Sequence, residues 1–340
     1  MTMHLAVDAH NLLTDRRGIG VYLRAILARF AQNDDLALTL LVREVFPQRL
    51  HARIAAEIGS DRFDLARSIP KRADLSWHPW NGTFFASRHV KRAVTVHDCA
   101  PFAFPLPNAR ARRRQQDPFL RSSRADRLIT DSQFSRDEIV RFLRVESKRI
   151  DVVPLAADPR FTPGETTLLP EALRERPYVL AVGANDARKN LELLAAAHRA
   201  AFPDGEVTLA CVTRGAPAGT LELADVRFEL LRDVYRGALA LAMPSLYEGF
   251  GIPPLEAMRC GTPVVSSRAT SLPEVCGDAA LYVDAATSQG DWTSALQRIA
   301  RDGRLRVDLR ERGLARAASF SWNRTAALTL QALRTTAGMG

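Results

Sequence analysis

Short apolar runs alternate with longer helical patterns along almost the whole chain. Such alternation is typical of βαβ units, in which crossover helices cover buried parallel strands. The candidate strands of the first half are His4–Asp8, Leu38–Val42, Leu75–Trp77, Ala93–His97, Arg127–Thr130 and Asp151–Pro154. Those of the second half are Tyr178–Val182, Val207–Val212, Ala238–Met243, Pro263–Ser266 and Ala280–Val283. The pattern predicts an α/β protein with two doubly wound, Rossmann-like domains.

The length of 340 residues exceeds what one hydrophobic core usually supports, which also favours two domains. Residues 158–177 carry four prolines and are predicted to form a linker. We therefore expect an N-terminal domain over residues 1–157 and a C-terminal domain over 178–319, followed by a closing segment, 320–340. Ligands of such sheets bind outside the carboxyl ends of the strands. Two facing sheets would place the site in a cleft between the domains.

Compartment and partners are constrained by the remaining composition. The first nine residues lack the apolar stretch of a signal peptide, and no window reaches the roughly 18 uninterrupted apolar residues of a membrane span. We therefore expect a cytoplasmic protein. The four cysteines show no metal-ligand spacing and are interpreted as reduced, buried side chains.

The net charge of +9 lies wholly in the first half of the chain. Residues 1–155 hold 26 Lys and Arg against 17 Asp and Glu, whereas residues 156–340 hold 21 of each. Such a basic half suggests an anionic partner: nucleic acid, a membrane surface or a phosphate-bearing substrate. The densest cluster is Arg110, Arg112, Arg113, Arg114, Arg121, Arg124 and Arg127. Its spacing also fits an ordinary solvated helix, and both interpretations stay open.

An apolar strand over 238–243 runs into a Gly-x-Gly turn and then a helical pattern. Glu248 and Glu256 stand eight positions apart around that turn. Backbone N–H groups at a helix N-terminus, together with the helix dipole, favour an anion. A carboxylate at each end would hydrogen-bond sugar hydroxyls on either side of a bound diphosphate. The combination indicates a nucleotide-sugar.

A second strand-turn-helix corner, residues 183–190, carries the cations Arg188 and Lys189. Cleavage of a sugar–phosphate bond builds negative charge on the leaving oxygen, and a cation placed there in advance lowers the barrier. Surface basic residues at a helix start are the plainer interpretation. Cations are unfavourable at that end of a helix, so we favour a functional role.

Residues 244–284 resemble, in order, the Glu-x7-Glu region of retaining glycosyltransferases of the GT-B fold. This large family, family 4 or "glycosyl transferases group 1", includes bacterial mannosyltransferases. The resemblance implies two Rossmann-like domains facing across a cleft. It also implies that the helix after Phe320 packs back towards the N-terminal domain.

The resemblance assigns roles to residues of the C-terminal domain. Glu248 is implied to bind the donor sugar, and Glu256 to hold the ribose, whose two vicinal hydroxyls need two acceptor oxygens. Arg188 and Lys189 are implied to stabilise the diphosphate, although Ala184 stands where some relatives carry an Arg. No permanently bound cofactor and no metal are expected. The remaining predicted donor-binding residues here are Asn190, Gly249, Phe250, Gly251 and Leu255.

Three features of the N-terminal domain also fit the family. Gly18, Ile19 and Gly20 resemble its Gly-Ile-Gly-x-Tyr loop, which lines the cleft opposite the donor phosphates. His97 is implied to touch the transferred sugar. Asp98 is expected either to orient the His97 ring or to cap the next turn. The aromatic run at 77–82 suits either an acceptor site or a buried corner.

These observations predict a retaining hexosyltransferase. Our best hypothesis is transfer of mannose from GDP-mannose to a saccharide or lipid-linked saccharide, in lipopolysaccharide or exopolysaccharide synthesis. The protein would then sit on the anionic inner face of the plasma membrane. Alternatives are a UDP- or dTDP-sugar donor, or a GT-B epimerase. A non-enzymatic nucleic-acid binder is remote, because aromatic residues make up only 7% of the chain and no nucleic-acid motif occurs.

Overall fold

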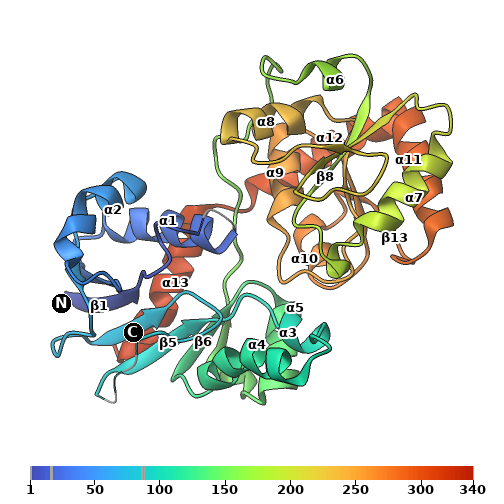
Figure 1. Cartoon of the computed structure of the whole chain (residues 1–340). Coiled ribbons are helices and arrows are strands. Elements are labelled where there is room, and N and C mark those ends of the chain that lie inside the picture. Colours follow the sequence, from blue (N-terminus) through green and yellow to red (C-terminus); the bar gives the residue numbers. More distant parts are fainter. Residues whose placement is uncertain (1, 16–17, 86, 88, 340) are drawn as a thin grey trace. The chain divides into compact units, whose positions relative to one another are not determined.

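The computed structural model describes residues 2–15, 18–85, 87 and 89–339 (Figure 1). The chain forms two compact units. Met1–Leu155 and Trp322–Gly340 make up the first, and Ala156–Ser321 the second. Each unit is built on one parallel sheet with helices around it. The predicted α/β class with two doubly wound sheets is confirmed.

The first unit holds a seven-stranded sheet in the order β3-β2-β1-β4-β5-β6-β7. All neighbouring strands pair in parallel. The strands are β1 (Met3–Asp8), β2 (Leu36–Leu41), β3 (Asp64–Ala66), β4 (Leu75–His78), β5 (Lys91–Thr95), β6 (Arg127–Thr130) and β7 (Ile150–Val152). The chain therefore starts in the middle of the sheet, runs to one edge, and returns at β4 to build the other half.

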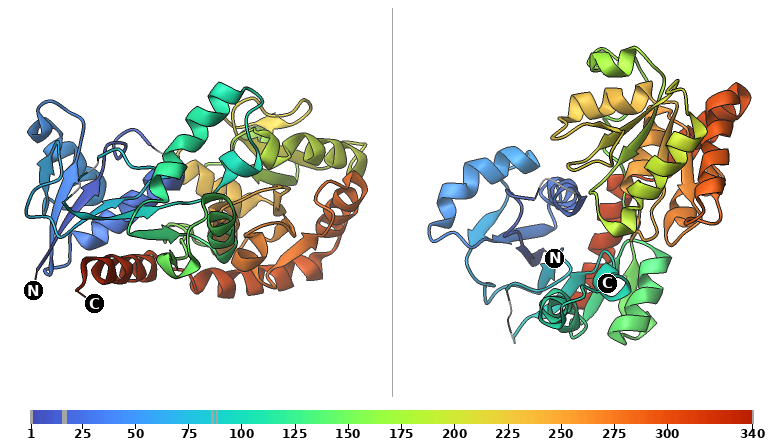
Figure 2. Two further views of the ribbon diagram at one scale, coloured as in Figure 1. Left: turned by 90° about the horizontal axis from the view of Figure 1, so that it is seen from below. Right: turned by 45° about the vertical axis from the view of Figure 1, so that its right-hand side comes forward.

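Helices of the first unit come mostly from the connections between its strands. They are α1 (Gly18–Phe30), η1 (Pro47–Leu50), α2 (His51–Ile58), α3 (Ala100–Ala103), α4 (Ala109–Ser122), α5 (Gln133–Leu143), η2 (Ser147–Arg149) and α13 (Trp322–Ala337). The C-terminal helix α13 packs against α1 and across β4, β5 and β6. Figure 2 shows it, in dark red, running beside the first-unit sheet. Thr325 Oγ1 fastens its start by donating to the carbonyl of Pro154 at 2.7 Å.

The second unit holds a six-stranded parallel sheet in the order β10-β9-β8-β11-β12-β13. The strands are β8 (Tyr178–Val182), β9 (Thr208–Val212), β10 (Leu221–Glu222), β11 (Ala240–Met243), β12 (Val264–Ser267) and β13 (Ala280–Val283). The helices are α6 (Glu171–Arg174), η3 (Ala187–Lys189), α7 (Leu191–Ala201), α8 (Phe228–Gly237), α9 (Ile252–Cys260), α10 (Leu272–Cys276), α11 (Gln289–Arg301) and α12 (Gly303–Ala318).

The expected strands lie where the apolar runs placed them, with ends that differ by a few residues. Arg127–Thr130, Tyr178–Val182 and Ala280–Val283 match to the residue. The edge strands β3 and β10 went unpredicted, because two or three residues are too short to show a period of two. Residues 158–177, expected to link the domains, group with the second unit. The side chains of Leu169 and Leu173 in this segment are buried, so the segment packs as part of a folded unit.

None of the helices in the described part of the chain combines the length and the apolar character that crossing a bilayer requires.

Candidate active site

The order in which the chain adds strands to the second sheet reverses between β8 and β11, the two central strands. The chain leaves β8 towards β9 on one side and leaves β11 towards β12 on the other. Open parallel sheets bind ligands at such a switch point, beyond the carboxyl ends of the strands. Residues 183–190 follow β8, and residues 244–251 follow β11. Both predicted corners therefore meet at this one place.

The corner after β8 is a tight backbone structure. Gly183 has a φ of 144°, which a residue with a side chain rarely adopts. The carboxylate of Asp186 caps η3 by accepting from the N–H of Arg188 at 3.2 Å. Asn190 lies in the left-handed region at φ 56°, and its amide donates to the carbonyl of Ala286 at 3.1 Å. This turn presents Lys189 towards the neighbouring corner.

The corner after β11 is held by hydroxyl groups. Ser271 Oγ donates to the carbonyls of Glu248 and Phe250, at 2.9 and 2.8 Å. The N–H of Glu248 donates to Thr270 Oγ1 at 3.1 Å. Ser267 Oγ donates to the carbonyl of Ser245 at 2.6 Å. These hydrogen bonds fix a loop that lies outside the strands and helices, so Glu248 has a defined position.

An ion cluster joins the two corners. Lys189 Nζ lies 2.5 Å from Glu248 Oε1, which also accepts from Ser245 Oγ at 2.6 Å. Arg188 Nη1 lies 3.9 Å from Glu248 Oε2, and its Nε lies 3.2 Å from Asp186. Glu248 is only 6% exposed, so its charge needs these partners. The structure thus brings together Glu248, Arg188 and Lys189, whereas His97, which is implied to touch the transferred sugar, belongs to the first unit.

Helix α9 begins directly beyond this cluster. Its N-cap is Gly251, with a φ of 110°. The first turn of the helix contains Pro253 and Pro254, which carry no N–H, so backbone donors there are limited to Ile252 and Leu255. The side chain of Leu255 is fully buried, so a ligand would reach this residue through its N–H alone. Gly249 and Phe250, also predicted to bind the donor, lie in the buried loop before it.

Glu256 lies on α9, one turn into the helix. Its Oε2 accepts from the buried hydroxyl of Tyr235 at 2.7 Å. Burial raises the pKa of this carboxyl to about 7, although the Tyr235 hydrogen bond acts in the opposite direction. The group therefore changes charge near neutral pH, which the sequence pattern does not predict.

His97 lies in the first unit, just beyond β5. Its Nδ1 is 2.7 Å from Asp131 Oδ2, and its Nε2 is 3.3 Å from the carbonyl of Pro79. Burial alone would lower the pKa of His97, but the Asp131 carboxylate, together with the Pro79 carbonyl and the charge of Asp98, outweighs burial and raises it. The rings of Tyr22 and His97 lie nearly perpendicular to each other, with their centroids 5.1 Å apart.

Asp131, at the end of β6, is the residue that orients His97, although no sequence motif marks it for that role. Asp98 instead accepts from the N–H of Ala100 at 3.0 Å, which is the capping role left open for it. The carboxyl ends of neighbouring strands β5 and β6 bring His97 and Asp131 together. That adjacency, once the strands are placed, is the signal that finds the pair.

Gly18, Ile19 and Gly20 form the first turn of α1. Gly18 is exposed and Gly20 is buried. A Cβ on Gly20 would overlap the carbonyl group of Asp15, so this close approach requires glycine. Arg16 and Arg17, which precede these residues in the sequence, lie outside the described residues.

The aromatic run at 77–82 forms a buried corner. Trp77 and His78 are fully buried, and Trp80 is 7% exposed. Trp77 Nε1 donates to Thr95 Oγ1 at 3.0 Å, and Trp80 Nε1 donates to the carbonyl of Asp8 at 2.9 Å. Asp8, which no sequence motif singles out, is the centre of this corner.

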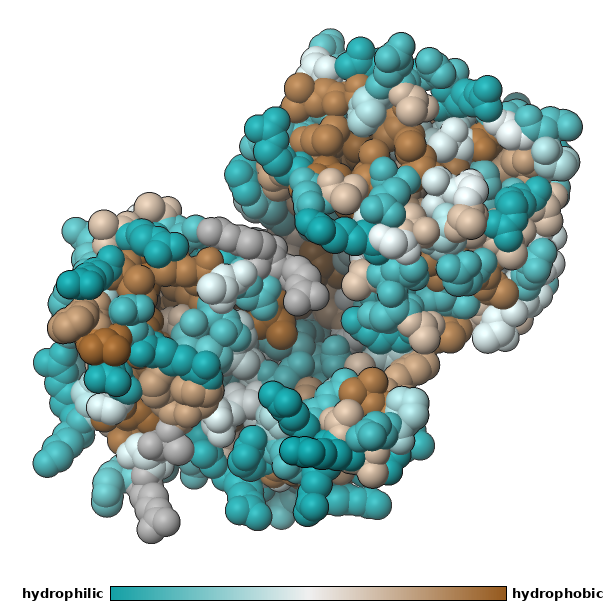
Figure 3. Space-filling model, viewed as in Figure 1, coloured by the Kyte–Doolittle hydropathy of each residue, from teal (hydrophilic) through white to brown (hydrophobic). Residues whose placement is uncertain are grey.

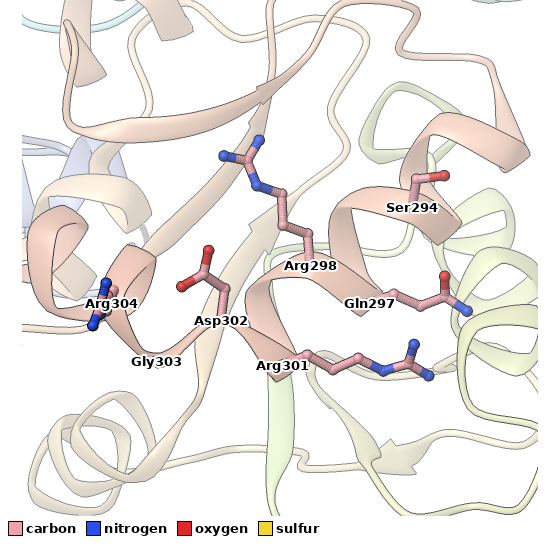
Figure 4. Close-up of a pocket in the computed structure, with 7 residues that line it drawn as sticks. All are labelled: Ser294, Gln297, Arg298, Arg301, Asp302, Gly303 and Arg304. Carbon is pink, nitrogen blue, oxygen red and sulfur yellow. The ribbon is translucent and has the colours of Figure 1, made fainter.

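A separate hollow lies between α11 and α12, and its lining residues are drawn in Figure 4. Three of them are the arginines Arg298, Arg301 and Arg304. Their guanidinium groups point in different directions, so they do not converge on one anion. Among the residues that the structure describes, no three His, Cys, Asp or Glu side chains are grouped to hold a metal ion.

Comparison with known proteins shows which family the chain belongs to. Residues 226–316 match the model "Glycosyl transferases group 1", and residues 43–161 match "Glycosyltransferase Family 4". O-antigen chain mannosyltransferase B of Escherichia coli is 33% identical over 286 residues, covering 77% of this chain and 74% of that protein. The chain is a family 4 glycosyltransferase. It is accordingly a hexosyltransferase, with a nucleotide-sugar donor and a saccharide acceptor.

Other relatives of this glycosyltransferase carry different names. D-inositol 3-phosphate glycosyltransferase of Rhodococcus jostii is 31% identical over 284 residues, 75% of this chain and 62% of that protein. The chain thus spans less than two thirds of that relative. Among solved structures, Anabaena HepE with UDP and glucose has a TM-score of 0.72 at 15% identity, covering 98% of this chain and all of that one. This likeness shows the fold, that of the GT-B glycosyltransferases.

Proposed function

We propose that this glycosyltransferase moves mannose from GDP-mannose to a saccharide acceptor, with retention of the anomeric configuration. The names of two relatives support mannose: the Escherichia coli protein above and O-antigen chain mannosyltransferase RfbU of Salmonella typhimurium, 29% identical over 232 residues. The inositol-phosphate glycosyltransferases argue for a wider range of acceptors.

The ion cluster at the second switch point carries the proposal. Arg188 and Lys189 lie beside Glu248 at the ends of the two central strands. Two fixed cations would neutralise the diphosphate of the departing nucleotide, and preorganised charges of this kind often contribute more to catalysis than any other effect. Glu248 would accept hydrogen bonds from hydroxyls of the transferred sugar. No metal is needed in this scheme, since the two cations supply the positive charge.

Retention follows if attack and departure share one face of the sugar. The bond from the anomeric carbon to the diphosphate oxygen breaks, and a bond from that carbon to the acceptor oxygen forms. The acceptor's proton passes to the departing phosphate oxygen. Glu256 would hold the ribose, with Oε2 also accepting from Tyr235. His97 would serve the transferred sugar from a ring position fixed by Asp131.

A UDP- or dTDP-sugar is the main alternative donor, supported by the fold likeness to HepE, which holds UDP and glucose. An epimerase on the same fold has no relative among those described above. The resemblance implies that the base contact falls within residues 213–236, a stretch that assigns no residue to one particular base, so the base is open.

A lipid-linked acceptor at the inner membrane face is also proposed. Helix α4 exposes Arg110, Arg113, Arg114 and Arg121, with Leu120 46% exposed among them. Figure 3 shows the strongly hydrophilic surface over this helix, in the lower part of the view. Arg127, expected in the same cluster, instead forms a two-point ion pair with Asp151. Each exposed arginine near an anionic surface contributes about 1 kcal/mol.

A thermal-shift screen with GDP, UDP, dTDP and their sugar conjugates tests the donor. A ligand at a hundred times its dissociation constant stabilises the folded protein by about 2.7 kcal/mol. A selective shift with GDP-mannose supports the proposal, and a shift with another nucleotide replaces the donor but keeps the enzyme class. No shift with any nucleotide would contradict the proposed role of the second switch point.

Vesicle sedimentation tests the membrane surface. Arg113→Glu together with Arg114→Glu should abolish binding to phosphatidylglycerol vesicles. Arg304→Glu, at an exposed arginine of the second unit, is the matched control and should lower binding little. Equal binding by both variants would remove α4 from the proposal.

A further inference from the structure

The first unit contains a polar cluster that the proposed chemistry does not use. Asp8 ends β1, and its Oδ1 lies 2.6 Å from Nδ1 of His10. Its Oδ2 lies 3.2 Å from Nδ1 of His78, at the end of β4, and 3.3 Å from the N–H of Phe84. Trp80 completes the set by donating to the backbone carbonyl of Asp8. We call these five residues the Asp8 cluster.

The Asp8 cluster occupies the switch point of the first sheet. The chain leaves β1 towards β2 and returns to pair β4 on the other side of β1. This geometry matches that between β8 and β11 in the second sheet. The same rule that places the donor in the second sheet therefore marks the Asp8 cluster as a ligand position.

The electrostatics of the cluster leave histidine nitrogens for a ligand. Burial would raise the pKa of Asp8, but hydrogen bonds from His10 and His78 outweigh it and lower the pKa to about 2. The ionised Asp8 carboxylate accepts a hydrogen bond from the Nδ1–H of each ring. The Nε2 of each histidine therefore lies on the side of the ring that faces away from Asp8. Among the described residues, the buried Nε2 of His78 has no hydrogen-bond partner. The side chain of His10 is 13% exposed.

Aromatic side chains lie beside the ring of His10. The ring of His10 lies 4.8 Å from Phe84 and 5.2 Å from Trp80, centroid to centroid. Phe84 is 48% exposed, and the guanidinium of Arg43 lies over its ring at 3.2 Å. Sugar sites combine an apolar surface with a few placed hydrogen-bonding groups. The exposed Arg43 adds donors for further hydroxyls.

We propose that the Asp8 cluster binds one saccharide ring of the acceptor, with Nε2 of His10 hydrogen-bonded to a sugar hydroxyl and the sugar packed against the part of the Phe84 side chain that His10 and Arg43 leave exposed. This subsite rests on the proposed function, since it supplies the acceptor for that transfer. Asp8 acts through His10 as a positioning residue, because its carboxylate sets which nitrogen faces the ligand. A neutral saccharide fits better than an anion, because the buried charge at the centre is negative.

Saturation-transfer NMR with methyl α-D-mannopyranoside tests the subsite on the full chain with saturating GDP present. His10→Asn keeps an amide donor for Asp8 and removes Nε2. We expect it to weaken saccharide binding about 3- to 10-fold, the range for one lost hydrogen bond. Phe84→Ala, at an exposed side chain, should weaken binding similarly. The matched control is His4→Asn, near the start of β1 and away from its carboxyl end, and should bind like the unmodified protein.

The Glu248→Gln variant separates this subsite from the donor site. Binding that survives Glu248→Gln but falls in His10→Asn supports the subsite. Binding lost in Glu248→Gln and kept in His10→Asn would place the saccharide in the donor site and overturn the inference. So would absence of any saccharide signal in the unmodified protein. If GDP itself fails to bind while saccharide binding still depends on His10, the GDP donor is rejected and the subsite is supported. Melting temperatures of the variants show that each is folded.

Discussion

The two switch points share one topology but differ in charge. In the second sheet Arg188 and Lys189 surround Glu248. In the first sheet a single carboxylate, Asp8, is surrounded by the rings of His10 and His78. Two cations suit a diphosphate, whereas imidazoles beside aromatic rings suit the hydroxyls and apolar face of a sugar. In the proposed scheme, sheet topology therefore sets where each ligand would bind, and the residues at the strand ends would decide which ligand.

The two sites also differ in how far apart their residues lie in the chain. Loops 183–190 and 244–251 each contain a contiguous run with the pattern of a motif. The Asp8 cluster takes its members from residues 8–10 and 78–84, with no run that carries the chemistry by itself. Local sequence patterns therefore mark both corners of the second site, whereas in the first they mark only the aromatic run at 77–82, as one of two alternatives, and miss Asp8 and His10.

The largest expected effect comes from Lys189→Ala, which removes the single lysine between residues 156 and 340. We expect turnover to fall about 100- to 1,000-fold, the usual cost of one preorganised charge-stabilising group. Nucleotide affinity, measured by calorimetry, should change much less. The control is Arg312→Ala, whose ion pair with Asp308 lies on α12 of the same unit. If Lys189→Ala and the control variant lost nucleotide affinity equally and kept their turnover, the cations would have no special role at the second switch point. The functional contrast between the two switch points would then fail.

The pH dependence of stability should distinguish Glu256 from an ordinary carboxylate. The folded protein keeps the Glu256 proton up to a pKa of about 7, whereas an unfolded chain releases it near 4.5. Between these values the folded state binds more protons, so the contribution of Glu256 to stability falls as pH rises and levels off above pH 7. At about 1.4 kcal/mol per pKa unit, the fall is about 2 to 4 kcal/mol.

Urea denaturation of the unmodified protein and of Glu256→Gln, from about pH 4.5 to pH 8, measures this contribution. The variant should lose the downward slope, and Glu192→Gln, on the exposed side of α7, should keep it. Parallel curves for all three proteins would mean that Glu256 is ionised throughout.

The pair of His97 and Asp131 is expected to contribute more to the free energy of unfolding than Asp98 does. Asp131→Asn keeps the shape of the side chain but removes the charge from a buried partner of His97. We expect the free energy of unfolding to fall by about 1–3 kcal/mol. Asp98→Asn, which can still cap Ala100, should cost under about 1 kcal/mol. A reversed order in chemical denaturation would restore Asp98 as the residue that matters.

The smallest expected effect is that of Ser245→Ala. Its hydroxyl shares Glu248 Oε1 with Lys189, so its loss should lower kcat/KM only about 3- to 10-fold. Steady-state kinetics with the donor varied gives the value, and Ser294→Ala, at an exposed position on α11, should change nothing. A loss as large as that of Lys189→Ala would show that the hydroxyl, and not the cation, organises the second site.

The sequence marks the residues that meet at the second switch point because they lie in two short contiguous runs. Glu248, Gly251 and Glu256 follow one strand within a short run, and the glycine φ and helix start follow from that run. It predicts His97 as well, but offers the neighbouring Asp98 as the residue that orients the ring. The true partner, Asp131, lies 34 positions away and becomes adjacent only when β5 pairs with β6. Asp8 escapes prediction for the same reason.

Apolar periodicity by itself predicted the fold class and the two sheets of this protein, and the resemblance of residues 244–284 to a known family predicted its family. These properties depend on residues close in sequence, whose period and turn chemistry are visible without a fold. Only the tertiary structure decided which carboxylate orients His97, that Arg127 pairs with Asp151, and that Asp8 joins His10 to His78. Such partners depend on the order of strands in a sheet, and strand order is set by packing over long sequence separations.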